Sequence, residues 1–220
     1  MLSKDIIEQT TREAIKLRAE SPGLEFKGSG PFEPLKYAIA KAAQGMSNNR
    51  DGGYIIIGVK QKKGSVTIVQ GVSLDSERTY DPEIVYEFVN RYASPPVEIQ
   101  TVSVDHDNKT FIAIAVPPFT RTPTVCRLAT PPGVHPEDGM RPGDVFIRPL
   151  DKIETRRVQT GAEMDDLLQI ALARRVAEMF GALPDALQAL LTQIGKAEAP
   201  TAPAKRQPFE DEVSDIDDYL

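Results

Sequence analysis

The chain has 220 residues, with 26 Lys or Arg, 32 Asp or Glu and a formal net charge of −6, which argues against a protein coated with basic residues throughout. It has no run of eighteen apolar residues and no signal-peptide pattern, so we expect a soluble, cytoplasmic protein without a membrane segment. The single cysteine, Cys126, excludes an internal disulfide, and without a Cys/His cluster a structural zinc site is not expected.

Two amphipathic helices are predicted in the first fifty residues. The first spans residues 3–18, and its buried side is formed by Ile6, Ile7, Ala14 and Ile15. The second spans residues 34–46, where apolar side chains also recur at helical spacing. Residues 48–53 then form a turn, and the apolar run 54–59 that follows is typical of a central strand covered on both faces.

Between these helices, residues 24–27 read as a short strand that begins after a turn. Side chains alternate along a strand, so Glu25 and Lys27 share one face. An exposed ion pair of this kind usually contributes only about 0–1 kcal/mol to stability. The turn also brings Glu20 toward Glu25, and two carboxylates at one site could coordinate Mg²⁺ or Mn²⁺ for phosphodiester cleavage.

A hairpin, a third helix and further strands are predicted in the middle of the chain. Residues 66–70 are expected to pair with the run 54–59, and Asp81-Pro82 is a strong helix start. Residues 97–104 and 110–116 alternate and flank a polar turn, which predicts a hairpin. One more strand is predicted at 121–128.

The C-terminal part is predicted to be helical and then unstructured. Thr160 and Glu163 form a capping box, so a helix should run from there to about residue 180. A leucine-rich second helix is expected over 184–194, and these helices either pack on the sheet or form a contact between two copies. Residues 196–220 read as a linker and a disordered acidic tail, which either solubilises the chain or recruits a protein partner.

Charge is distributed unevenly along the chain. Residues 1–63 hold eleven Lys or Arg against seven Asp or Glu, whereas residues 207–220 hold six acids and no base. A basic segment in an acidic chain can still bind phosphate, because charges act over only about 10 Å at 0.1 M salt. Lys60, Lys62 and Lys63 are therefore either a phosphate-binding surface or simply a solvated hairpin tip.

Several of these segments together resemble the Schlafen-type Alba-like domain, a family described as DNA-binding. The matching residues are Glu25-Phe26-Lys27, Asn49, Gly52-Gly53, Ile57-Gly58-Val59 and Phe146-Ile147-Arg148, and the resemblance covers roughly residues 20–157. It implies nucleic-acid binding. The absence of a Walker-type loop makes ATP binding the least favoured function.

For some animal members, the resemblance also implies a metal-dependent ribonuclease with three carboxylates. Two of them match Glu20 and Glu25, with the same five-residue spacing. The third acid normally follows the Gly-Val strand, where this chain has residues 60–63 with three lysines. Asp51 or Asp75 would then have to replace it. A lysine run does not ligate a divalent cation, but it suits phosphate contact.

Together these observations predict an α+β fold, with a mostly antiparallel mixed sheet flanked by helices. We expect a nucleic-acid-binding domain over 1–157, a helical extension over 158–195 and a flexible linker and tail over 196–220. The expected ligand is DNA or RNA, without a cofactor, and the phosphate contacts are assigned to Lys27, Asn49, Arg50, Lys60, Lys62, Lys63 and Arg148. Two alternatives remain open. One is a nuclease that uses Glu20 and Glu25 with Mg²⁺ or Mn²⁺, and the other is an interaction protein that recruits a partner through its C-terminal helices or tail.

Overall fold

The computed structural model describes residues 2–62, 65–149 and 153–181, and it confirms an α+β fold with a mostly antiparallel sheet. Contacts between residues divide the chain into two units, Met1–Ala177 and Glu178–Leu220. Every strand that the structure describes belongs to the first unit, and the described residues of the second unit continue the last helix. No helix in the described part of the chain has the length and apolarity needed to span a bilayer.

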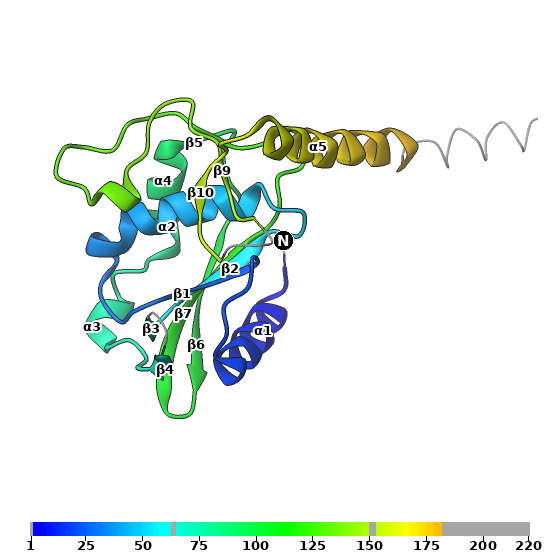
Figure 1. Ribbon diagram of the computed structural model, residues 1–220. Coiled ribbons are helices and arrows are strands. Elements are labelled where there is room, and N and C mark those ends of the chain that lie inside the picture. Colours follow the sequence, from blue (N-terminus) through cyan, green and yellow to red (C-terminus); the bar gives the residue numbers. More distant parts are fainter. Residues whose placement is uncertain (1, 63–64, 150–152, 182–220) are drawn as a thin grey trace, which may run out of the picture. The chain divides into compact units, whose positions relative to one another are not determined.

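The central sheet has the strand order β1-β2-β7-β6 (Figure 1). β1 (Leu24–Lys27) runs parallel to β2 (Gly53–Ile57), and α2 (Phe32–Ser47) provides the crossover that a parallel pair requires. β2 is antiparallel to β7 (Lys109–Val116). β7 forms the predicted hairpin with β6 (Gln100–His106).

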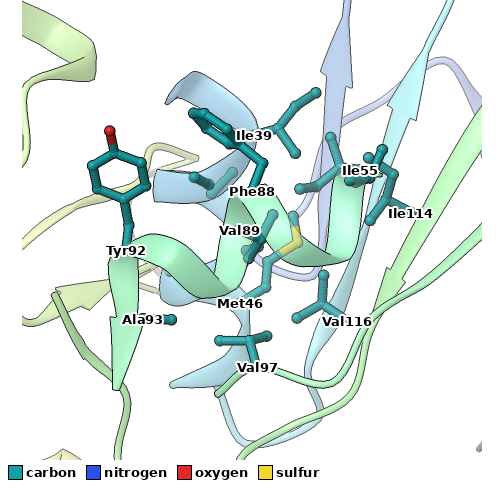
Figure 2. Close-up of a cluster of buried hydrophobic side chains, with 14 of the residues drawn as sticks. Ile39, Met46, Ile55, Phe88, Val89, Tyr92, Ala93, Val97, Ile114 and Val116 are labelled. Carbon is teal, nitrogen blue, oxygen red and sulfur yellow. The ribbon is translucent and has the colours of Figure 1, made fainter. Parts of the chain in front are cut away.

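Helices cover both faces of this sheet. Figure 1 shows α1 (Lys4–Leu17) on one side and α2 with α4 (Pro82–Tyr92) on the other. Alternate residues of β2 enter the two layers: Ile55 packs with α2 and α4, whereas Ile56 packs with α1. Figure 2 shows Met46 of α2 and Val89 of α4 beside Ile55 and Ile114 of the sheet. The apolar run is thus explained by two buried faces, as predicted.

Smaller elements complete the described chain. They are β3 (Val59–Lys62), β4 (Ser65–Val69), α3 (Leu74–Glu77), β5 (Ala93–Ser94), β8 (Val125–Cys126), a 3-10 turn (Pro136–Asp138), β9 (Phe146–Ile147), β10 (Arg156–Arg157) and α5 (Gly161–Gly181). β3 pairs with β4, β5 with β8 and β9 with β10, all antiparallel. The predicted caps are confirmed, because the Asp81 carboxylate accepts from the first turn of α4, and Thr160 and Glu163 form the capping box of α5.

The predicted strand 54–59 is wrong in one respect, because the chain turns at Gly58. This residue has a φ of 107°, which an L side chain rarely adopts, and a Cβ there would lie 2.9 Å from the Phe111 ring. β2 therefore ends at Ile57. β3 leaves the sheet, so residues 65–69 pair with β3 rather than with the whole apolar run.

Other predictions need smaller corrections. Ile6 is 49% exposed, because helical geometry places it on the outer side of α1, and Thr11 takes a buried position instead. The strand predicted at 121–128 is reduced to β8, because this segment is paired with only the two residues of β5. The helix at 184–194, the linker and the acidic tail lie outside the described residues.

Candidate functional site

Glu25 lies at the edge of the sheet, on the face that α2 covers, and it is paired with two cations. Lys27 Nζ lies 2.5 Å from one carboxylate oxygen, as expected for strand neighbours on one face. Arg148 donates to the other oxygen. The side chain of Arg148 is only 1% exposed and that of Glu25 is 12% exposed, so this is a buried ion pair with Lys27 at its solvent side.

Arg148 also holds the turn that leads into β1. Its guanidinium donates to the carbonyls of Pro22 at 2.9 Å, Ser21 at 3.3 Å and Leu24 at 3.2 Å. It donates to Thr155 Oγ1 at 3.0 Å as well. The planar fork of an arginine suits several acceptors at once, and here it ties the segment after β9 to the start of β1. A phosphate could reach this buried side chain only if these bonds were broken.

Glu20 lies near Glu25 but is committed to the backbone. Its Oε1 accepts from Phe26 N at 2.7 Å, which fixes the turn before β1. Burial raises the pKa of the Glu20 carboxyl above its ordinary value, and the negative charge of Glu25 adds to this effect, while the bond from Phe26 opposes it. Glu20 therefore lies close enough to Glu25 for their charges to interact, as the turn between them led us to expect.

The residues around this pair do not fit a divalent-cation site. Both oxygens of Glu25 are already in contact with cationic side chains. Lys60 occupies the place where the third acid is expected, and it is exposed. Within residues 2–62, 65–149 and 153–181, no three His, Cys, Asp or Glu side chains lie close enough to hold a metal ion. A metal could bind Glu25 only by displacing Arg148 or Lys27.

Lys41 is a cation that sequence analysis missed. It lies on α2, where Nζ donates to the Glu137 carbonyl at 2.6 Å and lies 5.7 Å from the centre of the Phe146 ring. Burial lowers the pKa of Lys41, and the positive charges of Arg157 and Lys27 lower it further, while Asp138 and Glu25 oppose the shift. Lys41 therefore lies in the same local field as the Glu25 cluster.

The remaining predicted contact residues that the structure describes lie on the turn after α2 and on β3. Asn49 donates from its amide to the Pro22 carbonyl at 3.0 Å, which links the turn after α2 to the turn before β1. Arg50 and Lys60 are exposed. Lys63 and the side chain of Lys62 lie outside the described residues. The structure thus places Lys27 and Arg148 at one cluster and Arg50 on a separate turn.

The turn over residues 48–53 is fixed by two features that the sequence did not reveal. Asn48 is buried, and its amide donates to the carbonyls of Thr124 and Phe146 while it accepts from Thr124 N. Gly52-Gly53 is required by packing, since a Cβ on Gly52 would lie 2.2 Å from the Val116 carbonyl oxygen. The glycine pair therefore has a structural explanation that does not involve phosphate.

Arg174 of α5 was also missed, because its bonding partners lie far from it in the sequence. It donates to the carbonyls of Phe119 at 2.6 Å, Asn49 at 3.1 Å and Arg50 at 2.6 Å. Its guanidinium also lies 4.1 Å from the centre of the Phe119 ring. Arg174 thereby attaches α5 to the turn after α2.

A cleft of about 620 Å³ lies between this turn and α5. Pro22 and Gly23 of the turn before β1 also line it, as does the side of Arg148. Its volume falls within the range of about 300–1,000 Å³ that is usual for small-ligand sites.

The chain matches one protein-family model and is similar to several solved structures. A family model described as Schlafen, AlbA_2 matches residues 20–155. No curated protein matches the chain significantly. One similar solved structure is the DIP2311 protein of Corynebacterium diphtheriae, with 16% identity and a TM-score of 0.43; the match covers 70% of this chain but only 27% of that one. Another is the N-terminal domain of a RecG-related protein of Nitrosomonas europaea, whose description names an ATP-dependent DNA helicase. It has 18% identity and a TM-score of 0.41, and the match covers 73% of this chain and 97% of that one.

Proposed function

The chain belongs to the Schlafen, AlbA_2 family, and from this premise we propose that it binds nucleic acid through phosphate contacts made mainly by Lys27, Lys41 and Lys60. Family membership supports a nucleic-acid-related function in general. The particular surface is our proposal, and it differs from the sequence-based prediction. It adds Lys41 and leaves out Asn49 and Arg148, which are engaged in structural bonds. It also leaves out Arg50, which lies on the turn after α2, and Lys62 and Lys63, whose side chains lie outside the described residues.

The observation that carries the proposal is the gathering of cationic side chains around Glu25, in a field that also contains the carboxylates of Glu20 and Asp138. This one carboxylate meets two cations, Lys27 and Arg148. Lys41 adds another positive charge, because its Nζ donates to a carbonyl and not to a carboxylate. An anion that approached Lys27 and Lys41 would reduce the repulsion between them, so the local field favours a phosphate group.

Lys60 extends this surface along the chain. Gly58 N donates to the Lys27 carbonyl at 2.9 Å, so β3 begins beside the end of β1. The three lysines therefore follow one another from α2, across the end of β1, to β3. Contacts spread in this way fit a sugar-phosphate backbone and carry no sequence information by themselves.

The test is fluorescence anisotropy of the full chain with labelled single- and double-stranded DNA and RNA over a salt series. We expect binding that weakens with salt, and we expect Lys41→Gln to lower the affinity and to reduce the slope of log K against log salt by about 1. Lys27→Gln should behave in the same way. The matched control is Lys16→Gln, which removes the same charge from an exposed position on α1, at the opposite face of the sheet.

Each result has a defined meaning. Equal losses in Lys41→Gln and Lys16→Gln would indicate a net-charge effect and would remove Lys41 from the contact surface. No binding to any of the four probes would overturn the proposed function. The same mixtures on a denaturing gel with Mn²⁺ test the nuclease alternative, which requires a cut that disappears in Glu25→Gln. A chain truncated after residue 195 tests the partner-recruiting alternative. That alternative requires the truncation to alter partner capture and to leave the affinity for nucleic acid unchanged.

A further inference from the structure

The outward side of α5 has features that neither the phosphate surface nor the cleft uses. We propose that this side is the contact between two copies of the chain, which pack through α5 in antiparallel orientation about a two-fold axis. The attachment of α5, its exposed apolar side chains and the order of its charges carry this proposal, which does not depend on nucleic-acid binding.

One side of α5 is fixed to the rest of the first unit. Leu167 is only 3% exposed, and Arg174 donates to three backbone carbonyls. At the start of the helix, Arg156 donates to Glu163. Glu163, Leu167 and Arg174 are separated by four and then seven residues, so they lie on one face of the helix. The opposite face is therefore directed away from these contacts.

This opposite face exposes large apolar side chains. Leu168 is 54% exposed, Leu172 is 58% exposed and Val176 is 39% exposed. Because they are spaced by four residues, they form one stripe along the helix. In the second unit, Met179 and Phe180 of the same helix are also exposed. A helix that is apolar on more than one side is usually covered on each of them, and contiguous exposed apolar surface marks a protein contact.

Opposite charges lie at the two ends of the central part of this stripe. Asp165 precedes Leu168 by three residues, and Arg175 follows Leu172 by three residues. The four positions are thus spaced by three, four and three residues, which is the spacing of the seam in a pair of packed helices. All four residues are exposed. We call these four positions the α5 seam.

The α5 seam is complementary to itself when two copies run antiparallel. Leu168 and Leu172 have residue 170 as their midpoint, and Asp165 and Arg175 share this midpoint. One two-fold axis at this level therefore brings each leucine to the other leucine of the second copy, and each aspartate to the arginine. In a parallel pair, each charge would instead face its own copy and be repelled. A two-fold contact uses the same patch twice, and a patch with an acid at one end and a base at the other meets this requirement.

The size of this contact predicts a weak dimer. Stable interfaces usually bury about 1,200–2,000 Å² in total, and two helices that meet over about three turns provide less than this. The charge pairs at the two ends add little affinity but select the orientation. We therefore expect a dissociation constant in the micromolar range.

Sedimentation velocity of the full chain over a micromolar concentration series tests the proposal. The apparent mass should rise with concentration from that of one chain toward that of two. Leu172→Glu places a carboxylate in the middle of the α5 seam at an exposed position, and it should weaken the dimer about tenfold or more. The matched control is Ala173→Glu, which adds the same charge at the next exposed position, outside the seam.

Charge reversal tests the orientation of the two helices. Asp165→Arg should weaken the dimer, because two arginines then face each other at both ends of the contact. The double variant Asp165→Arg/Arg175→Asp should restore it, because each end again pairs opposite charges. In a parallel pair, the wild type and both variants would associate equally, since each charge would face its own copy in all three.

The remaining outcomes would overturn the proposal. A dimer that forms equally well in Leu172→Glu would place the contact elsewhere, and equal weakening by Ala173→Glu would show a response to net charge alone. A chain that stays monomeric at every concentration would leave the α5 seam to another occupant. Urea denaturation then identifies that occupant: lower stability of Leu172→Glu would indicate a segment of the same chain, and unchanged stability would indicate a different protein. Equal association of the charge-reversal variants and the wild type would overturn the antiparallel arrangement.

Discussion

Two kinds of cationic side chain lie around Glu25, and their surroundings give them different uses. Arg148 is buried and bonded to a carboxylate, a hydroxyl and three carbonyls, so its donors are engaged within the protein. Lys27 and Lys41 lie at the border with solvent, where Lys27 pairs with Glu25 and Lys41 Nζ donates to the Glu137 carbonyl. Glu25 connects the two groups because each of its oxygens faces one of them.

This contrast shows that a basic residue in a motif is not automatically a ligand-binding residue. A buried charge requires partners that replace its hydration, and those partners fix the backbone around it. A charge at the surface keeps its water and can exchange it for a phosphate. The four predictions below each remove one polar or charged side chain that is bonded within the protein, and they measure what its bonds contribute.

Arg148→Ala is expected to have the largest effect. It leaves the buried Glu25 carboxylate with Lys27 alone and releases three carbonyls, so we expect the free energy of unfolding to fall by about 3–5 kcal/mol. Urea denaturation followed by circular dichroism measures the change. Arg127→Ala, at an exposed position, is the control.

The double variant Glu25→Gln/Arg148→Met should lose less stability than Arg148→Ala, because no uncompensated carboxylate remains. If the stability of Arg148→Ala lay within about 0.5 kcal/mol of that of the wild type, Arg148 would not have the structural role assigned to it here.

Asn48→Ala ranks second. Its amide makes three bonds to the backbone at Thr124 and Phe146, all in the interior, and their loss leaves buried groups without partners. We expect a decrease of about 2–3 kcal/mol in the same urea experiment. The adjacent Asn49→Ala breaks one bond at a half-buried position and should cost about 1 kcal/mol or less. Equal losses at the two positions would contradict this ranking.

Arg174→Ala ranks third, because it affects the attachment of α5 and not the sheet. Loss of its bonds to three carbonyls should lower stability by about 1–2 kcal/mol and increase amide exchange in α5. Arg174→Lys is the informative comparison, since it keeps the charge but lacks the planar fork. Exchange rates in Arg174→Lys close to those of the wild type would show that charge alone holds the helix.

The sequence predicted those parts of the fold that depend on local periodicity. The β6–β7 hairpin, the caps of α4 and α5 and the two-faced burial of β2 all follow from patterns within a few residues. The end of β2 at Gly58 could not be predicted in this way, because the same apolar run is compatible with one strand or with two. Only the Phe111 ring and the backbone of Gly71, which crowd this position, decide where β2 ends.

The candidate site was predictable to a lesser extent, for a physical reason. The proximity of Glu20 and Glu25 followed from a turn, and the pairing of Glu25 with Lys27 followed from strand alternation. The long-range bonds of Arg148, Asn48 and Arg174 join segments 55 to 127 residues apart, and no local pattern contains them. A charged side chain gives the same signal in the sequence whether its partner is a phosphate or a distant carbonyl.

The smallest effect is expected at the start of α5, at the half-buried carboxylate of Glu163. The Glu163 carboxylate is paired with Arg156 and accepts from Gln159 N at 2.8 Å and Thr160 N at 3.2 Å. Arg156 first, and then these backbone bonds, lower the pKa of Glu163 from 4.5 to about 2. Because the folded-state pKa lies below the unfolded value, this stabilisation is complete above pH 4.5 and is lost as the pH falls through 2.

Amide exchange at the first turn of α5, measured by NMR between pH 5 and 2, tests this prediction locally. After correction for intrinsic exchange rates, protection should decrease toward pH 2 in the wild type, and Glu163→Gln should lack this pH-dependent component. The global unfolding midpoint should change little, because the pair is partly exposed and is screened by water and salt. Asp165→Asn, two residues further along α5, should keep the wild-type profile. A profile in Glu163→Gln that matches the wild type would mean that another carboxylate controls this turn, and the helix start would then not depend on the capping box.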